Sequence, residues 1–543
     1  MNLIDECWIP VRRADGTQGR ISPLMIGDPD VVALDAVRAD FNGALAQFLI
    51  GLLQTTTPMN DMSTWKDLLA SPPGRDVLDA WFSPVRDAFV LDGDGPRFMQ
   101  DLTLSMAEEP TPVSALLLET PGEQSLKFNK DHFVKRDTVN GLCIECAAMA
   151  LLTMQINAPA GGAGHRTSLR GGGPLTTLVI SADEGARTLW KDLWLNVRQR
   201  SVFLGQGGDP AKVDAKFTFP WLADIARLQP EKGEFSPLQG HPAHVFWAMP
   251  RRIRLDFSSG ESGFCDLCGA HSSNLVARYV TRNYGLNYKG AWNHPLSPYY
   301  ESKPGEWLPL HPQPGGYGYR HWLPWVLGSS RQGKSQRPAS VVSDFLTHHH
   351  RTGQFRLWAF GYDMDNMKAR CWYESTLPIF GLASCDEDRQ RQVQNIAGQW
   401  VEGAGLVALW LRDAVKTAWF GSGEVRGDLS HVDAMFFSHT EPAFYTLLAR
   451  LIDQARVAEL DAELSLLELR EQWHQVLTTA ARHLFDESLV GVAGAVDNNP
   501  RRLADAHKAL MSRLRGDMLR ETLGLAAPGS GKSKKGLRKV KEA

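Results

Sequence analysis

The sequence contains few cysteines, seven among 543 residues, and this scarcity excludes a disulfide framework as its main source of stability. Long apolar runs are also missing. The longest near the N-terminus, Phe48 to Leu53, is far shorter than the roughly 20 residues that a membrane-spanning helix needs. The first residues lack the charged and apolar regions of a signal peptide. We therefore expect a cytoplasmic protein with no membrane partner.

The sequence also lacks an excess of charge of either sign. Lys and Arg total 58 and Asp and Glu total 61, a formal net charge of −3, which excludes a uniformly basic protein that coats nucleic acid. The balance is uneven, because residues 527–543 carry a net charge of +5 and the remainder carries −8. This basic tail has no apolar periodicity, so we predict that it is disordered.

The first 380 residues predict a large mixed α/β domain. Short apolar runs alternate with turn signals there, and residues 175–180 and 355–360 are typical of strands. Residues 41–55 and 146–157 are typical of buried helices. The order lacks the regular strand–helix alternation of a doubly wound sheet.

The remainder predicts a four-helix bundle over residues 381–526, which makes the fold class α+β. Four segments there repeat apolar residues at three- and four-residue spacing, and Pro442 and Pro500 stand where a first-turn proline is tolerated. The segments are residues 389–420, 441–457, 463–489 and 499–525.

Two CxxC pairs predict a structural zinc site. Cys143 and Cys146 precede a helix, and Cys265 and Cys268 lie in a turn-like stretch, with 118 residues between the two pairs. Four thiolates form the tetrahedral ligand set that Zn²⁺ prefers in closed structural sites. Four ordinary reduced cysteines, or a redox pair, are the alternatives.

Two segments have compositions suited to nucleic acid. Residues 161–173 hold six glycines interleaved with His165, Arg166 and Arg170, so their backbone can approach a ligand closely. Residues 127–137 alternate basic and aromatic side chains that can serve phosphates and stacked bases. A flexible surface connection and a solvated loop are the respective alternatives.

One pair of acids suggests an enzyme. Asp363 and Asp365 are spaced to lie on one face of a strand, an arrangement that can hold Mg²⁺. A polar hairpin tip has the same composition. The sequence contains no HExxH, GxSxG or kinase-type signature.

Six segments, in this order, resemble CasA, the large subunit of the type I-E CRISPR surveillance complex, Cascade. They are NLIDECWIPV (2–11), KFNKDHFVKRDTVNGLCIECAAMAL (127–151), INAPAGGAGHRTSLRGGGPLTTLV (156–179), GFCDLCG (263–269), WNHPLSP (292–298) and GYDMDNMKARCW (361–372). The likeness covers most of residues 1–380, and the helical remainder is similar to the family's C-terminal four-helix bundle.

The resemblance implies a function without catalysis. CasA proteins recognise the short PAM beside a target in double-stranded DNA from the minor groove, where the donor and acceptor pattern is degenerate. They help to open the duplex so that crRNA pairs with the target, and they recruit the helicase-nuclease. The partners expected for this chain are therefore the other Cascade subunits, crRNA, the target duplex and that helicase-nuclease.

The resemblance also assigns residues, segment by segment. The PAM-contacting glycine loop falls on Gly161, Gly162, Ala163 and Gly164, and the wedge that splits the first base pair falls on Asp365, Asn366 and Met367, with Asn366 nearest to the family's glutamine. The first long loop, which contacts crRNA and neighbouring subunits, supplies Phe128, Asn129, His132 and Phe133, with Lys130 and Arg136 for phosphates.

One departure concerns Phe264, which stands where the family can present a lysine before the first cysteine of the second CxxC, so no charged groove contact is transferred there. Two other functions stay open. One is a metal-dependent nuclease that uses Asp363 and Asp365. The other is a zinc-stabilised scaffold that only bridges subunits.

Overall fold

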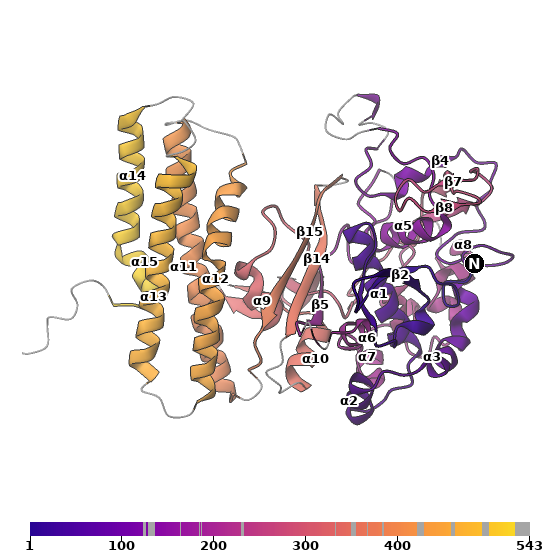
Figure 1. Ribbon diagram of the computed structural model, residues 1–543, viewed down its shortest axis with the longest axis horizontal. Coiled ribbons are helices and arrows are strands. Elements are labelled where there is room, and N and C mark those ends of the chain that lie inside the picture. The colour runs from indigo at the N-terminus through magenta and orange to yellow at the C-terminus, as the bar shows by residue number, and fades with distance from the viewer. Residues whose placement is uncertain are drawn as a thin grey trace, which may run out of the picture. The chain divides into compact units, whose positions relative to one another are not determined.

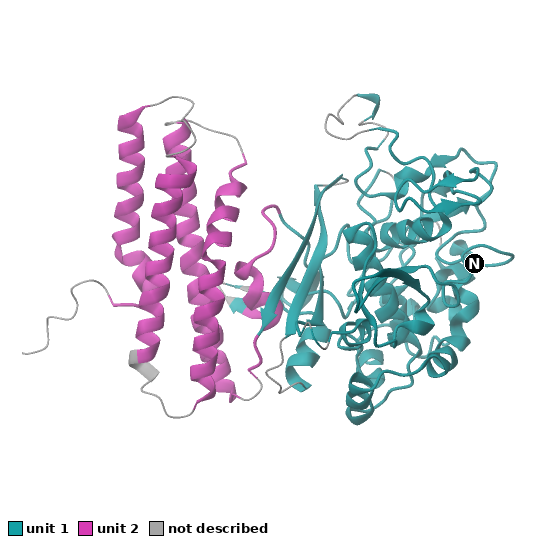
Figure 2. Cartoon of the chain, in the orientation of Figure 1, with its two compact units in different colours: residues 1–313, 330–348, 353–379 teal, residues 314–329, 349–352, 380–543 magenta. Residues whose placement is uncertain are grey.

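The computed structural model divides the chain into two units, one of mixed structure and one helical (Figure 2). The N-terminal unit comprises residues 1–313, 330–348 and 353–379, and the helical unit comprises residues 314–329, 349–352 and 380–543. The structure describes residues 1–122, 126–128, 136–162, 164–183, 185, 187–229, 233–331, 333–348, 355–365, 368–382, 385–420, 428–457, 462–490 and 499–526.

Helices of the N-terminal unit are mostly short, apart from α1 and α5 (Figure 1). They are α1 (Ala39–Thr56), α2 (Met62–Ala70), α3 (Arg75–Phe82), α5 (Ile144–Asn157), α6 (Leu189–Trp194), α7 (Arg200–Leu204), α8 (Ile225–Leu228) and α10 (Ser340–His348). The two expected buried helices are thereby confirmed as α1 and α5.

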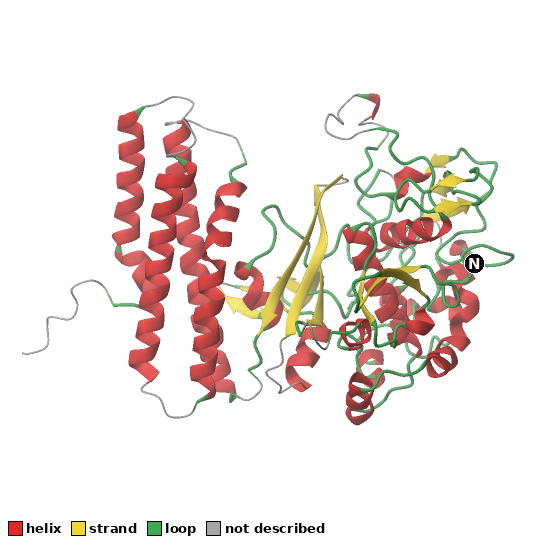
Figure 3. Cartoon of the chain, in the orientation of Figure 1, coloured by secondary structure: helices red, strands yellow, loops and turns green. Residues whose placement is uncertain are grey.

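The strands of this unit form several small antiparallel sheets rather than one large sheet (Figure 3). Their orders are β2-β1-β3, β11-β10-β13-β12, β15-β14-β5, β4-β9-β6 and β7-β8. The strands are β1 (Ile9–Arg13), β2 (Gln18–Ile21), β3 (Val31–Leu34), β4 (Thr111–Pro112), β5 (Thr176–Ser181), β6 (Arg252–Asp256), β7 (Gly263–Phe264), β8 (His271–Ser272), β9 (Arg278–Arg282), β10 (Tyr299–Lys303), β11 (Glu306–Pro309), β12 (Ser329–Arg331), β13 (Lys334–Arg337), β14 (Phe355–Asp365) and β15 (Lys368–Ile379). Both predicted strands are confirmed, as β5 and as the first half of β14.

Aromatic side chains hold the core of the N-terminal unit. Phe48 of α1 lies edge-on to Trp8 (5.4 Å between ring centroids), Phe89 (5.7 Å), Phe98 (5.9 Å) and Trp247 (5.8 Å). Each such pair contributes about 0.5–1.5 kcal/mol beyond the burial of apolar area. This cluster joins segments from residue 8 to residue 247, so it fixes the frame on which the candidate sites lie.

Acid is expected to destabilise this unit through His244, which is fully buried between the Phe217 carbonyl (2.9 Å) and the Tyr288 hydroxyl (2.9 Å). Burial lowers the pKa of His244 to about 4, below the roughly 6.5 of an unfolded histidine. As the pH falls below 6.5 the unfolded chain therefore takes up a proton first, and about 2 kcal/mol of stability is lost by pH 5. Unfolding midpoints between pH 7 and pH 5 measure this loss. His244→Gln should flatten that pH dependence, and an unchanged slope would contradict the assignment.

The helical unit confirms the predicted bundle (Figure 1). Its long helices are α11 (Glu387–Phe420), α12 (Ser430–Arg456), α13 (Ala462–His483), which continues as a π-helical stretch over Leu484–Leu489, and α14 (Pro500–Arg515). The short helices α15 (Asp517–Thr522) and α9 (Trp322–Val326) belong to the same unit. Trp400 of α11, Phe444 of α12 and Trp473 of α13 meet in its core, with ring centroids 5.6–6.4 Å apart.

The second helix of the bundle corrects one expectation. Pro442 does not lie in a first turn, since α12 begins at Ser430 and the proline is inside the helix. Residues from the segment 314–329 support the turns before it: the Tyr319 hydroxyl lies 2.9 Å from Thr440 Oγ1, and the Tyr319 N–H donates to Glu441 (3.2 Å). These contacts tie the turn before the proline to the segment 314–329.

The fold is thus a mixed α/β N-terminal part followed by a helical bundle, as the sequence predicted. The linear domain boundaries at residues 380 and 526 stay a proposal. The structure groups residues 314–329 with the bundle. Over the described ranges, no helix is both long enough and apolar enough to cross a membrane.

Candidate nucleic-acid interface and metal centre

Four cysteines form a compact cluster in the N-terminal unit. The sulfur atoms of Cys143, Cys146, Cys265 and Cys268 all lie within 4.8 Å of one another, and those of Cys143 and Cys268 are 3.6 Å apart. None of them is in a disulfide. Tetrahedral thiolates around a zinc ion are about 3.8 Å apart, from a metal–sulfur distance of about 2.3 Å. The cluster therefore has the ligand set and spacing to hold a metal ion.

Local structure places each half of the cluster. Cys143 is the N-cap of α5 and its sulfur accepts from the Cys146 N–H, one turn on. Cys265 and Cys268 lie in the turn between β7 and β8, closed by a hydrogen bond from the Gly269 N–H to the Cys265 carbonyl (2.9 Å). Asp266 joins the two halves, because its carboxylate accepts from the N–H groups of residues 140 (2.6 Å) and 141 (2.8 Å).

The electrostatics of the cluster favour a cation among the sulfurs. Hydrogen bonds from Cys143 and then Cys146 lower the pKa of Cys265. The interaction with Cys143, then that with Cys265, and then burial raise the pKa of Cys146. Neighbouring sulfurs this close cannot all ionise without a positive charge between them. A divalent metal supplies that charge. Without a metal, most of the four cysteines stay protonated and neutral.

The glycine loop follows α5 and has a defined backbone at its described positions. The His165 N–H donates to the Gly162 carbonyl (3.1 Å), which closes a turn over the loop. Gly164 adopts a φ of +83°, and a Cβ there would lie 2.8 Å from the Cβ of Asn283. Gly162 differs, since a Cβ there would meet nothing within 4 Å. Ala163 lies outside the described residues.

A strand extension supports the loop from one side. Tyr284, just after β9, has a φ of +67°, which is uncommon for a residue with a side chain. Its N–H donates to the Gly164 carbonyl (2.9 Å), and its ring lies 5.5 Å from the Arg166 guanidinium. This extension and Gly164 therefore fit together through backbone and ring contacts.

Two arginines lie beneath the loop. Arg170 is buried with only 4% exposed, and its guanidinium donates to Thr176 (3.0 Å), Ser297 (2.9 Å) and Gln47. The sequence interpretation of Arg170 as a phosphate or groove contact is therefore wrong, because no nucleic acid can reach a side chain this deep. Arg251, which precedes β6, donates to the Pro159 carbonyl (2.6 Å) and to His165 Nδ1 (2.6 Å), one on each side of the loop.

The predicted wedge belongs to a hairpin formed by β14 and β15. Their register runs from Phe355 opposite Ile379 to Asp365 opposite Lys368, with an irregularity after Asp363. Asp365 is exposed at the end of β14. Asn366 and Met367 lie outside the described residues, so their assignment to the wedge stays a prediction.

The glycine loop and this hairpin end lie at the same end of one sheet. β5 pairs antiparallel with β14, from Thr176 opposite Phe360 to Ser181 opposite Phe355. The segment before β5, which carries the glycine loop, therefore lies toward the Asp365 end of β14. Direct packing agrees, since a Cβ on Gly173 would lie 2.9 Å from the side chain of Met364.

The acid pair differs from a metal site. The Asp363 side chain is 3% exposed and forms an ion pair with Arg370 at 2.6 Å, across the hairpin irregularity. Asp365 is exposed instead. The carboxylate that a nuclease would use to bind Mg²⁺ thus already has a guanidinium partner, so this geometry does not favour the nuclease alternative.

The first long loop is described only at its edges. Phe128 is 57% exposed, with the Lys127 ammonium 5.9 Å from its ring centroid. Arg136 donates to the Leu126 carbonyl at 3.2 Å. Asn129, Lys130, His132 and Phe133 lie outside the described residues, and their role in crRNA contact stays a prediction. Phe264, at the departure from the family pattern, is 70% exposed beside the cysteine cluster.

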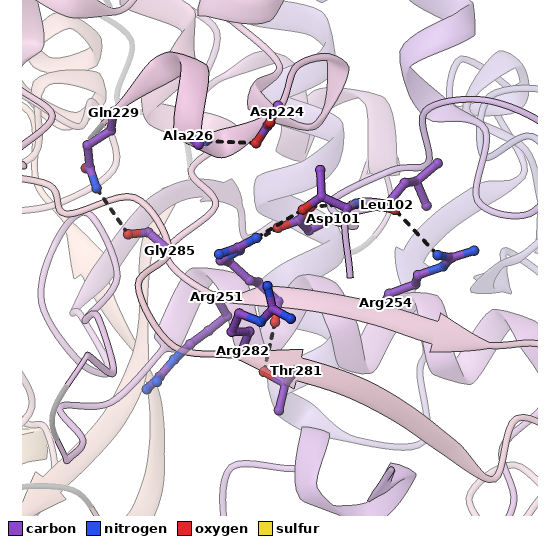
Figure 4. A network of polar contacts seen from close by, with 12 residues as sticks. Asp101, Leu102, Asp224, Ala226, Gln229, Arg251, Arg254, Thr281, Arg282 and Gly285 are labelled. Atoms are coloured by element: carbon purple, nitrogen blue, oxygen red, sulfur yellow. Dashed lines mark hydrogen bonds and ion pairs between the residues drawn. The ribbon is translucent and has the colours of Figure 1, made fainter. Parts of the chain in front are cut away.

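Sequence reasoning missed Arg251 and Tyr284. Both lie more than 80 positions from the loop that they contact, and neither belongs to a recognisable motif. The only sequence signal was basic density, since arginines occur at positions 251, 252, 254, 278 and 282. In the structure β6 and β9 pair with Arg252 opposite Arg282, and Arg251 comes directly before β6; Figure 4 shows Arg251, Arg254 and Arg282 in this region.

Comparison with known proteins gives a family. The family described as CRISPR-associated protein Cse1 matches residues 2–484 of this chain.

Solved structures share the fold over nearly the whole chain. Cse1 from Thermobifida fusca has a TM-score of 0.68 at 16% identity, covering 97% of this chain and 98% of its own. Cse1 from Acidimicrobium ferrooxidans has a TM-score of 0.65 at 18% identity, covering 97% and 99%. A chain from a structure named "CRISPR RNA-guided surveillance complex" has a TM-score of 0.66 at 17% identity, covering 95% and 99%.

Proposed function

Because this chain belongs to the Cse1 family of CRISPR-associated proteins, we propose that it is the large, non-catalytic subunit of a crRNA-guided surveillance complex. In that complex it recognises the PAM in foreign double-stranded DNA, helps to open the duplex for R-loop formation and recruits the helicase-nuclease. Base pairing then reads the target sequence, while the protein reads the PAM and the shape of the DNA.

The observation that carries this proposal is the shared location of two elements. The glycine loop before β5 and the hairpin end at Asp365 lie at one end of the β15-β14-β5 sheet. A protein that reads a PAM and opens the adjacent base pair needs a groove-contacting loop and a wedge at adjoining places. The glycine-rich segment leads into β5 and the hairpin contains β14, and these two strands are joined by backbone hydrogen bonds.

Within the proposal, each segment has a role. The backbone of Gly161, Gly162, Ala163 and Gly164 lies against base edges in the minor groove, where small residues allow close approach. Asp365, Asn366 and Met367 form the wedge, and Met367 supplies its apolar part. Phe128, Asn129, His132 and Phe133 contact crRNA and neighbouring subunits, and Lys130 and Arg136 bind phosphates.

Zinc is the metal that the cysteine cluster fits best. Four cysteines, three of them buried, can supply all four ligands of a structural zinc ion, which leaves no position for substrate. The ion would tie the N-terminus of α5 to the β7–β8 turn, and its role is structural. The net charge of −3 is consistent with a subunit of a cytoplasmic complex that touches nucleic acid through a few loops and leaves most crRNA binding to its partners.

A binding selection on the assembled complex tests the proposal. The complex is reconstituted with crRNA and incubated with a duplex library that is randomised at the PAM, at a fixed salt concentration. We expect enrichment of a small set of related PAM sequences, and loss of that enrichment when this chain is left out. Equal recovery of all PAM sequences with the chain present would contradict the proposal and favour a scaffold.

A further inference from the structure

Arg170 and Arg251 are both bound by neutral partners at the glycine loop. Arg170 is bound by neutral oxygens only, from Thr176, Ser297 and Gln47. The two histidines nearby, His294 and His311, add no negative charge. Burial and then the charge of Arg170 lower the pKa of His294, while burial is the largest cause that lowers the pKa of His311.

Arg251 has neutral partners as well. Its guanidinium donates to the Pro159 carbonyl and to His165 Nδ1, while its buried Nε has no hydrogen-bond partner. Its backbone is fixed to α5, because the Gln155 amide donates to the Arg251 carbonyl (2.9 Å) and accepts from its N–H (3.0 Å). The guanidinium therefore has little freedom to turn toward an acid.

Three neighbouring arginines are paired with carboxylates instead, whereas Arg254 donates to the carbonyls of Leu102 (3.4 Å) and Leu104 (2.8 Å). Arg252 binds Asp101 (2.6 Å), Arg278 binds Asp256 (2.9 Å) and Arg282 binds Glu108 (2.5 Å). Among the described residues no carboxylate pairs with Arg170 or Arg251. Burial lowers the pKa of both to about 10, which leaves them charged at neutral pH.

We propose that Arg170 and Arg251 are positioning residues whose uncompensated charge acts through the glycine loop on the phosphates of the bound duplex. Burial of an unpaired charge is unfavourable in the free protein. A polyanion bound to the loop offsets that cost. The protein between the arginines and the phosphates has a low dielectric constant, so it weakens their attraction less than water does. Arg251 also holds both sides of the loop, at Pro159 and His165. This inference rests on the proposed function.

Charge-retaining and charge-removing substitutions test it in the reconstituted complex. Arg251→Met and Arg170→Gln should each weaken duplex binding about tenfold, whereas Arg251→Lys and Arg170→Lys should stay within about threefold of the parent. The full chain carrying Arg251→Met should lose less stability than one carrying Arg198→Met, because only neutral partners lose a hydrogen bond.

Arg198→Met is the matched control. Arg198 is as buried as Arg170, with 4% exposed, but it binds the Asp344 carboxylate (2.5 Å). Its loss should lower the unfolding temperature and leave duplex affinity unchanged. The inference is overturned if the lysine variants bind as weakly as the neutral ones, or if the neutral variants bind like the parent. Gly162→Asp in the same assay tests the proposed function separately from this inference. Parent-like binding by that variant would contradict PAM recognition by the loop itself.

Discussion

Gly162→Asp is expected to weaken binding of the assembled complex to PAM-containing duplex at least about 100-fold, without loss of fold. The added carboxylate would face the phosphates and the acceptor-rich minor groove, where like charges oppose each other. The position tolerates a side chain in the free protein, since a Cβ there meets nothing within 4 Å. Affinity at fixed salt and the unfolding temperature of the isolated chain are the two measurements.

Gly162 gives a cleaner test than Gly164. Gly164 adopts a positive φ and packs on Asn283, so any side chain there strains the loop itself. Gly74→Asp is the matched control, because Gly74 has an ordinary φ of −71° and equally open surroundings. It introduces the same charge far along the chain from the loop. Loss of affinity in both variants, or in neither, would contradict a specific contact at Gly162.

Cys143→Ser is expected to remove the bound metal and to lower the stability of the full chain by at least about 4 kcal/mol. A hydroxyl is a poor substitute for a thiolate as a zinc ligand, and the free energy of structural zinc binding is folding free energy. The metal joins α5 to the β7–β8 turn, and 118 residues lie between the nearest cysteines of these two segments. Metal content and the unfolding transition measure the effect.

Cys385→Ser provides the control for this variant. Cys385 is also a buried free cysteine, but it lies in the helical unit and outside the cluster. It should keep one equivalent of zinc and lose far less stability. Chelation of the parent should reproduce the Cys143→Ser transition. A parent protein without zinc, with four freely titratable thiols, would contradict the metal site.

The fold could be predicted from sequence where the signal is long and local. The helices of the bundle each repeat apolar residues over many turns, and α11, α13 and α14 begin within a few residues of their predicted starts. The start of α12 could not be predicted, because Tyr319, from a segment more than 100 residues earlier, supports the turns before Pro442. That support is a tertiary contact, which no local pattern contains.

The candidate sites, too, could be predicted from sequence only in part. Residue types and spacing determined that four cysteines can form one metal site and that residues 161–173 form a glycine-rich loop. Only the tertiary structure decided that the two CxxC pairs meet, and that the loop lies at the Asp365 end of β14.

Arg170 shows the physical reason for the difference. By sequence it is a basic residue among glycines, suited to a surface contact, and in the structure it is buried and bound to Thr176, Ser297 and Gln47. The sequence by itself determines the charge, volume and backbone freedom of each residue. Burial and electrostatic partners depend on segments far apart in the chain, so only the folded arrangement determines which arginines are paired and which leave their charge for a ligand.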